Sequence, residues 1–133
     1  INREVPGHLA NRLQAAMWRE AWHLVETDVA SVEDVDIAVS YGPGLRWALM
    51  GPILIHHLAG GKGGARHAFA HFGPLLEDLW ADLGSAPRIS NETVEKVIVG
   101  LEAESAGRTT EDLVQERDAL LISLIELLTR ERA

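Results

Sequence analysis

The chain of 133 residues has the length of one domain, and its 47% of hydrophobic residues, an ordinary share for a folded protein, excludes wholesale disorder. Its 20 acidic residues outnumber its 12 basic residues, for a net charge of −8, which excludes non-specific binding to nucleic acid because such binding needs clustered positive charge. The lack of cysteine excludes disulfides and thiolate chemistry.

Targeting signals are missing from the sequence. No run approaches the roughly 18 apolar residues of a membrane span, and no signal peptide opens the chain. We therefore expect a cytoplasmic protein, the compartment that the lack of cysteine favours, although exported proteins without cysteine also exist. The first residue is Ile1 rather than Met, from which we expect that an upstream segment has been removed.

The first predicted helix follows the Pro-Gly break in "VPGHLANRL" and carries two apolar faces. One face repeats at helical spacing through Leu9, Leu13, Met17 and Leu24. The other face runs through Asn11, Ala15, Trp18, Trp22 and Val25. A helix that is apolar around most of its circumference is normally covered on more than one side. We therefore expect another domain or another subunit to pack against this helix. We also predict a homodimer that forms through it.

Capping residues and breaks divide the next part of the chain into short helices. Ser31 is placed to cap a helix, and residues 41–52, "YGPGLRWALMGP", are predicted as a loop. Pro52 starts another helix, which "GGKGG" closes at residues 60–64. The helix after this turn is predicted to be interrupted at residues 73–74, a Gly-Pro pair.

The C-terminal part follows the same helical pattern. After the linker "SAPRIS", Ser90 or Asn91 caps a short amphipathic helix. Thr109 and Asp112 form a pair like a capping box before a last helix that runs to about Arg130. No convincing strand or hairpin turn is present, so the sequence predicts an all-α fold of about six helices.

Two motifs suggest chemistry but have simpler explanations. His67 and His71 lie four residues apart in "HAFAH", which is metal-ligand spacing, but no third ligand accompanies them. We interpret them as surface or structural histidines and predict no metal. "GGKGG" lacks the spacing and the preceding strand of a phosphate loop, and no GxGxxG occurs. We therefore expect no nucleotide site in this chain.

Asn11 and Arg46 are the remaining candidates for a site. A buried amide at Asn11 needs hydrogen-bond partners, which the backbone near the Pro-Gly break or a cleft shared with another domain would supply. Arg46 follows two glycines, and its guanidinium is suited to clamp a carboxylate with two hydrogen bonds. An ordinary salt bridge with one of the many acidic residues is the alternative.

The segment "VPGHLANRLQAAMWREAWHLVETDVASVEDVDIAVSYGPGLRWALMGP" resembles the C-terminal domain of the 3-hydroxyacyl-CoA dehydrogenase family. The opening PGxxxNRL, the helix start "ASVEDVD" and the loop "GLRWALMGP" carry the resemblance. Within the family, this segment most resembles the branch that contains L-carnitine dehydrogenase and lambda-crystallin (L-gulonate 3-dehydrogenase). The later motifs "LAGGKGGARHAFAHFGP" and "AGRTTEDLVQERD" resemble specifically the carnitine-dehydrogenase type. The similarity extends over nearly the whole chain.

The resemblance implies the following expectations. Residues 1–133 would be a helical substrate and dimerisation domain of 6-phosphogluconate-dehydrogenase-like type. An N-terminal Rossmann domain, outside this chain, would bind NAD and supply a catalytic His–Glu pair. The family's active-site asparagine falls on Asn11, and the arginine of the "GLR" loop, Arg46, is expected near the acid end of the substrate. Many relatives have Phe where this chain has His8, which leaves the substrate open among acyl-CoA thioesters, carnitine and sugar acids.

The full enzyme implied by the resemblance would be an oxidoreductase of 3-hydroxyacyl substrates, as in fatty acid metabolism. It would transfer a hydride from C3 to NAD. The chain alone would lack both the cofactor site and the acid–base histidine, so we expect it to be inactive by itself. The alternatives are an L-carnitine 3-dehydrogenase specifically, or a free-standing, non-catalytic all-α dimerisation module.

Overall fold

The computed structural model describes residues 3–85 and 88–132, and it is built from helices. In chain order these are α1 (Ala10–Glu26), α2 (Val32–Ser40), α3 (Pro43–Leu49), α4 (Pro52–Ala59), the 3₁₀ turn η1 (Gly61–Gly63), α5 (Gly64–Asp82), α6 (Asn91–Ser105) and α7 (Thr110–Arg132). The described residues form no strand. The predicted all-α fold is therefore confirmed.

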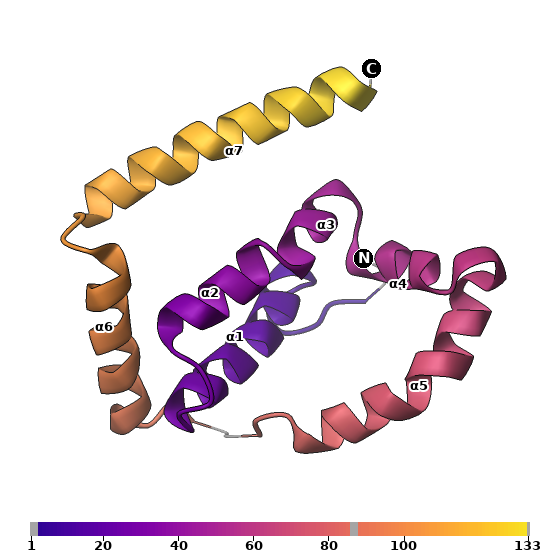
Figure 1. Cartoon of the computed structure of the whole chain (residues 1–133), viewed down its shortest axis with the longest axis horizontal. Coiled ribbons are helices and arrows are strands. Elements are labelled where there is room, and N and C mark those ends of the chain that lie inside the picture. Colours follow the sequence, from indigo (N-terminus) through magenta and orange to yellow (C-terminus); the bar gives the residue numbers. More distant parts are fainter. Residues whose placement is uncertain (1–2, 86–87, 133) are drawn as a thin grey trace.

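The helices form a packed centre with two arms (Figure 1). α6 packs against both α1 and α2, and α3 continues from α2. One arm is the α4–α5 pair, which joins the centre through α3. The other arm is α7, which leaves the end of α6 and packs along no other helix of the described chain (Figure 1).

The closest helix crossing in the centre depends on a glycine. A Cβ built on Gly100 of α6 would lie 2.2 Å from Cγ2 of Val32, the first residue of α2. Because only glycine leaves room for this approach, α6 and α2 come close enough to bury Val32. Val25, near the end of α1, is the other buried aliphatic side chain of the centre.

The three predicted helix caps are confirmed, and each is made locally. The Ser31 hydroxyl accepts a hydrogen bond from the Asp34 backbone at 3.1 Å in a capping box, and the Ser90 hydroxyl accepts one from the Thr93 backbone at 3.0 Å. Thr109 accepts from the Asp112 backbone at 3.1 Å. Such caps satisfy amides that have no partner within their helix.

Two sequence expectations were wrong. Residues 43–49, expected within a loop, form α3, because Pro43 at the first helical position has no N–H to lose and its φ suits a helix. The expected interruption at residues 73–74 is absent, and α5 runs continuously through Pro74. Gly73 explains this, because a residue without Cβ avoids the clash that disfavours helix before proline.

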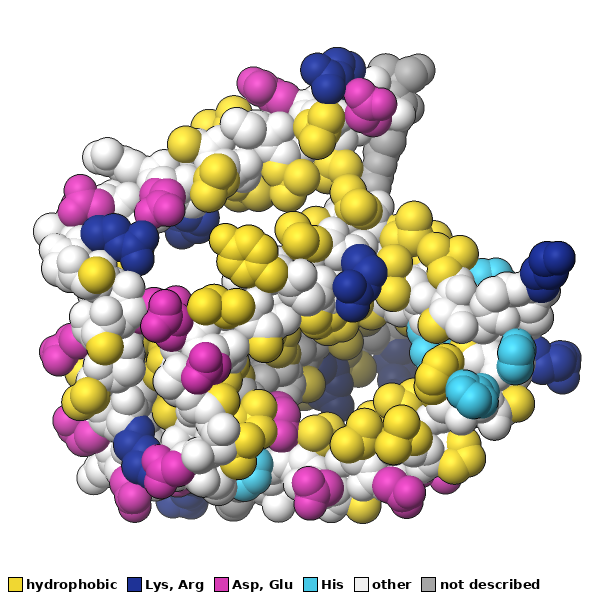
Figure 2. Space-filling model, in the orientation of Figure 1, with side chains coloured by type: hydrophobic (Ala, Val, Ile, Leu, Met, Phe, Trp, Pro, Cys, Tyr) yellow, Lys and Arg dark blue, Asp and Glu magenta, His cyan; other side chains and the backbone are white. Residues whose placement is uncertain are grey.

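The chain exposes far more surface than a compact protein of its size. Its accessible surface is 10805 Å², against about 6,900 Å² for a compact monomer of this mass. In the described ranges, the buried hydrophobic side chains are Val25, Val32 and Ala68. Figure 2 shows an opening between α7 and the α2–α3 part of the centre, with hydrophobic side chains on both of its sides.

α1 itself is exposed along most of its length, with Leu9 and Leu13 at 60% and 65% exposure. It is therefore not enclosed within a self-contained globule. None of the helices in the described part of the chain combines the length and the apolarity that crossing a bilayer requires.

Candidate functional site

The "VPGH" segment folds as a tight turn that delivers the chain into α1. The His8 backbone N–H donates to the Val5 carbonyl at 3.0 Å, with Pro6 and Gly7 between them. Gly7 has φ +77°, as the third residue of a type II turn requires, and Pro6 suits the second position. His8 also lies in the left-handed region at φ +51°, which histidine tolerates better than most side chains.

Asn11 lies directly after this turn, in the first turn of α1. Its side chain is exposed and makes no hydrogen bond within the described chain. The Asn11 Cβ lies 3.7 Å from the Cβ position of Gly7, so a side chain at Gly7 would pack directly against the amide-bearing residue. Of the two sources of partners considered from the sequence, the backbone near the Pro-Gly break does not supply one.

Arg46 lies on α3 and not in a loop, and its position depends on the tight turn from α2. A Cβ on Gly42 would lie 2.2 Å from the Ala38 carbonyl oxygen, and one on Gly44 would lie 2.6 Å from that of Val39. The two glycines therefore let α3 begin directly at the end of α2. The Arg46 guanidinium is exposed and forms no ion pair with the described residues, so the salt-bridge alternative is not realised.

Asn11 and Arg46 thus sit on two exposed helices as unpaired polar groups. No hydrogen bond or ion pair joins them within residues 3–85 and 88–132. Their amide and guanidinium groups are available to a molecule or domain outside this chain. An amide offers both a donor and an acceptor, and a guanidinium offers a fork of donors that matches a carboxylate.

A groove of about 540 Å³ runs along the second apolar face of α1. The Trp18 and Trp22 rings stack in parallel in its wall, with centroids 6.0 Å apart and planes 6° apart. Arg88 and Ile89 face them from the segment before α6. The sequence placed these two residues in a linker, and no local signal connects them to α1.

Long-range polar contacts hold the end of α1 beside α6. Ser90 donates to the Glu26 carboxylate at 3.0 Å, and Lys96 donates to the Glu26 carbonyl at 2.7 Å and to Asp28 at 2.9 Å. Hydrogen bonds from Thr93 and then Ser90 lower the pKa of Glu26. The hydrogen bond to Asp28 raises the pKa of Lys96, so this ammonium caps the end of α1 as a cation.

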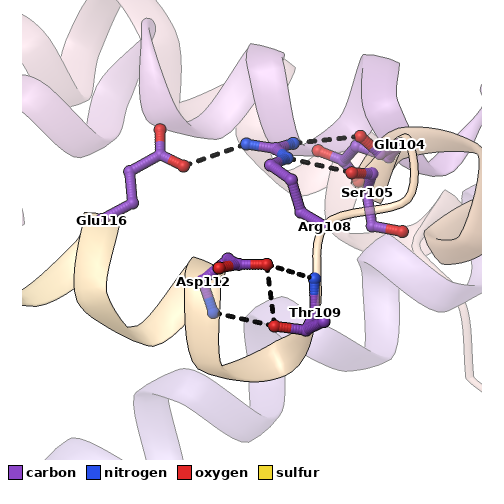
Figure 3. Close-up of polar contacts among 6 residues, drawn as sticks. All are labelled: Glu104, Ser105, Arg108, Thr109, Asp112 and Glu116. Carbon is purple, nitrogen blue, oxygen red and sulfur yellow. Dashed lines mark hydrogen bonds and ion pairs between the residues drawn. The ribbon is translucent and has the colours of Figure 1, made fainter.

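A polar cluster fixes the bend between α6 and α7 (Figure 3). Arg108 donates to the carbonyls of Ser105 and Glu104 at 2.9 and 3.1 Å and to the Glu116 carboxylate at 3.0 Å. The Glu104 Oε2 atom is buried and has no hydrogen-bond partner among the described residues. Burial, and then the nearby charge of Asp36, raises the pKa of Glu104.

Two histidines, one on α4 and one on α5, bond to the backbone of the glycine-rich turn. The Nδ1 atom of His57 accepts a hydrogen bond from the Ala65 backbone at 3.0 Å, and Nδ1 of His67 lies 3.1 Å from the Gly60 carbonyl oxygen. His71 contacts Phe72 edge-on, with centroids 4.7 Å apart. Within the parts that the structure describes, no three His, Asp or Glu side chains gather as metal ligands.

Comparison with known families gives a match over most of the chain. The model of the family described as "3-hydroxyacyl-CoA dehydrogenase, C-terminal domain" matches residues 7–99. This range begins at Gly7, within the turn before α1, and includes Asn11, the turn between α2 and α3, and Arg46 on α3.

Curated relatives are similar over essentially the whole chain. An L-carnitine dehydrogenase of Bacillus cereus (strain ZK / E33L) is 51% identical over 98% of this chain and 40% of the relative. L-Carnitine dehydrogenases of Streptomyces coelicolor and Pseudomonas aeruginosa are 45% and 38% identical, over 98% and 100% of this chain and 41% of each relative. The chain therefore spans about two fifths of the length of these relatives.

Proposed function

This chain belongs to the 3-hydroxyacyl-CoA dehydrogenase C-terminal domain family, and we propose that it is the helical substrate domain of an NAD-dependent 3-hydroxyacid dehydrogenase that oxidises L-carnitine. The observation that carries the proposal is the family match across the exposed Asn11 and Arg46 positions. The L-carnitine dehydrogenases among the relatives favour this substrate over acyl-CoA thioesters and sugar acids.

The two polar groups suit the carboxylate and the reacting hydroxyl of such a substrate. L-Carnitine carries a carboxylate and a 3-hydroxyl group. In our proposal, Arg46 holds the carboxylate through paired hydrogen bonds, which a guanidinium makes better than an ammonium. Asn11 binds the reacting hydroxyl or the base that deprotonates it. Both groups are exposed and unpaired in the described chain, as groups reserved for an external ligand should be.

The described residues do not fit an NAD site. A dinucleotide-binding turn follows a strand and opens a helix, whereas the glycine-rich turn of this chain lies between α4 and α5, and His57 and His67 occupy its surroundings. We therefore assign NAD, which accepts the hydride, and the catalytic His–Glu pair to a Rossmann domain outside this chain. Residues 1–133 contribute positioning of the substrate at that domain.

The exposed surface supports the structural part of the proposal. α1 has few neighbours of its own, so we propose that it closes the substrate cleft against the Rossmann domain and contributes to a homodimer. The absence of these two partners from the 133-residue chain would account for an accessible surface area well above that of a compact protein of the same mass.

An activity panel on the full-length protein tests the function. We expect NAD-dependent oxidation of L-carnitine, with much lower kcat/KM on 3-hydroxybutyryl-CoA and on sugar acids, and no turnover by the 133-residue chain alone. Asn11→Ala should lower kcat about 10²–10³-fold, the range for removing one hydrogen-bond donor at a reacting oxygen, without changing the oligomeric state.

Asn91→Ala is the matched control, since Asn91 is exposed on α6 and belongs to neither the site nor a cap. Its kcat should stay at the wild-type value. Unchanged turnover in Asn11→Ala would remove Asn11 from the site. A full-length protein inactive on the whole panel would instead favour a non-catalytic assembly module.

A further inference from the structure

A short corner joins α2 to α3, the helix that carries Arg46. We call Gly42, Pro43 and Gly44 the glycine corner. Gly42 precedes α3, Pro43 is the first residue of this helix and Gly44 is the second. Because α2 ends at Ser40, only two residues separate the helices, and no flexible loop lies between them (Figure 1).

Two backbone carbonyls of α2 come so near the corner that only glycine fits there. A Cβ on Gly42 would lie 2.2 Å from the Ala38 oxygen, and one on Gly44 would lie 2.6 Å from the Val39 oxygen, whereas real Cβ atoms essentially never approach closer than 3.0 Å. Both obstacles are backbone atoms of a helix, so they cannot swing aside as a flexible side chain would. The corner therefore fixes how closely α3 lies against the end of α2.

The other end of α2 is held in place by α6 and by its own cap. Val32 is buried where Gly100 of α6 leaves room for it. The Ser31 hydroxyl donates to the Asp34 carboxylate at 2.6 Å and accepts from the Asp34 backbone, which fixes the first turn of α2. α2 is thus a fixed base from which the corner directs α3.

The position of Arg46 follows from that of α3. Arg46 lies two residues after Gly44, about half a helical turn further along the chain. Its carbonyl accepts a hydrogen bond from the Met50 backbone at 3.0 Å, so its backbone belongs to the helix. Within residues 3–85 and 88–132, no hydrogen bond or ion pair holds the guanidinium itself. Its place is therefore set through the backbone of α3.

We propose that Gly44 is a positioning residue for the substrate carboxylate. The proposal rests on the function proposed above, in which Arg46 binds this carboxylate and Asn11 binds at the reacting hydroxyl. The missing side chain of Gly44 lets α3 lie close against α2, and this close approach sets the place of the guanidinium relative to α1, which packs on α2. Gly44 thereby selects for an acid group at one distance from the hydroxyl.

A methyl group at Gly44 would displace Arg46 by an amount that matters for binding. Ordinary contacts between carbon and oxygen are about 3.3–3.6 Å, so α3 would have to move by roughly 0.7–1 Å to relieve the contact of 2.6 Å with Val39. Groups in a site must lie within about 0.5 Å of their productive geometry. The paired hydrogen bonds of a guanidinium to a carboxylate are directional, so this shift is enough to weaken them.

Kinetics of the full-length enzyme test the proposal. Gly44→Ala should raise KM for L-carnitine at least about 10-fold and leave kcat within about 3-fold, because the group that binds at the reacting hydroxyl is untouched. L-Carnitinamide, in which a neutral carboxamide replaces the carboxylate, serves as a competitive inhibitor. Its inhibition constants for wild type and Gly44→Ala should agree within about 3-fold, since Arg46 makes no paired ionic contact with an amide. A protein damaged in its fold would lose affinity for both compounds.

Gly51→Ala is the matched control. A Cβ on Gly51 meets nothing within 4 Å, and its φ of −60° and ψ of 162° suit alanine before a proline. Its KM for L-carnitine should stay at the wild-type value. The double variant of Gly44→Ala and Arg46→Ala should bind L-carnitine no worse than Arg46→Ala alone, because two residues that act through one contact are not additive.

The outcomes separate this inference from the proposed function. A wild-type enzyme that does not oxidise L-carnitine, or an unchanged KM in Arg46→Ala, would refute the proposed function and this inference with it. An unchanged KM in Gly44→Ala beside a raised KM in Arg46→Ala would overturn the inference alone. So would equal losses of affinity for L-carnitine and L-carnitinamide, or additive effects in the double variant, because each would mean that Gly44 acts on the fold in general.

Discussion

Gly100→Ala has two opposing effects on the free energy of unfolding: alanine has the higher helix propensity, but its methyl group would overlap with Val32. Alanine inside a helix is favoured over glycine by about 1 kcal/mol. The added methyl group would lie 2.2 Å from Cγ2 and 2.8 Å from Cβ of Val32, whereas carbon atoms in contact need about 3.5–4.0 Å. α6 and α2 must therefore separate by more than 1 Å. Overpacking of this kind costs about 1–3 kcal/mol, and so large an overlap belongs at the upper end.

The net expectation is a loss of about 1–2 kcal/mol in the free energy of unfolding, which corresponds to a fall of roughly 3–8 °C in Tm for a domain of this size. Differential scanning calorimetry of the full-length protein measures it. Val32→Ala removes the closest atom, so the double variant should lose less stability than the sum of the two single variants, by about 1 kcal/mol. A Gly100→Ala protein that unfolds at a higher temperature than wild type would refute the α2–α6 crossing described above.

Two further predictions concern single carboxylates. The pKa of Glu104 is raised above its ordinary value of 4.5, so the folded protein holds this proton more tightly than the unfolded chain, and stability is lost as the pH rises through the folded pKa. Glu104→Gln removes that loss, and its stability advantage in urea unfolding should grow from pH 4.5 towards neutral pH; a constant difference would contradict the burial of Glu104. Glu20 accepts a hydrogen bond from the buried backbone N–H of Gly84 at 2.7 Å. Glu20→Ala should therefore lower the free energy of unfolding by about 1–3 kcal/mol in the same measurement, and Glu20→Gln by clearly less, because glutamine keeps an acceptor. No loss in Glu20→Ala would mean that the bond contributes nothing.

Features made by neighbouring residues could be predicted from the sequence. The caps at Ser31, Ser90 and Thr109 involve a side chain and a backbone group three residues apart, so the signal and its partner lie in one short window. The two errors, α3 and the continuity of α5 through Pro74, arose where glycine and proline can either break a helix or be accommodated in it. Which outcome holds depends on backbone geometry that a local pattern leaves open.

The candidate site divides in the same way. Asn11 and Arg46 were proposed as site residues through motifs, and the structure shows both side chains exposed. The position of Arg88 opposite α1 could not be predicted from the sequence. The contacts that hold its segment there join residues 64 or more positions apart, such as Ser90 and Glu26. The sequence did predict that α1 lacks cover, since its two apolar faces exceed what a small chain can bury.

The burial of so few aliphatic side chains has a consequence for how the molecule is made in the cell. If the proposed domain contact and homodimer hold, a newly synthesised copy gains little stability from its own interior, and its folding and assembly form one thermodynamic event that depends on protein concentration. Without such cover, the helices expose hydrophobic side chains, the kind of surface that aggregates and that chaperones bind. We therefore expect synthesis of this chain without the proposed neighbouring domain to lead to aggregation and proteolysis.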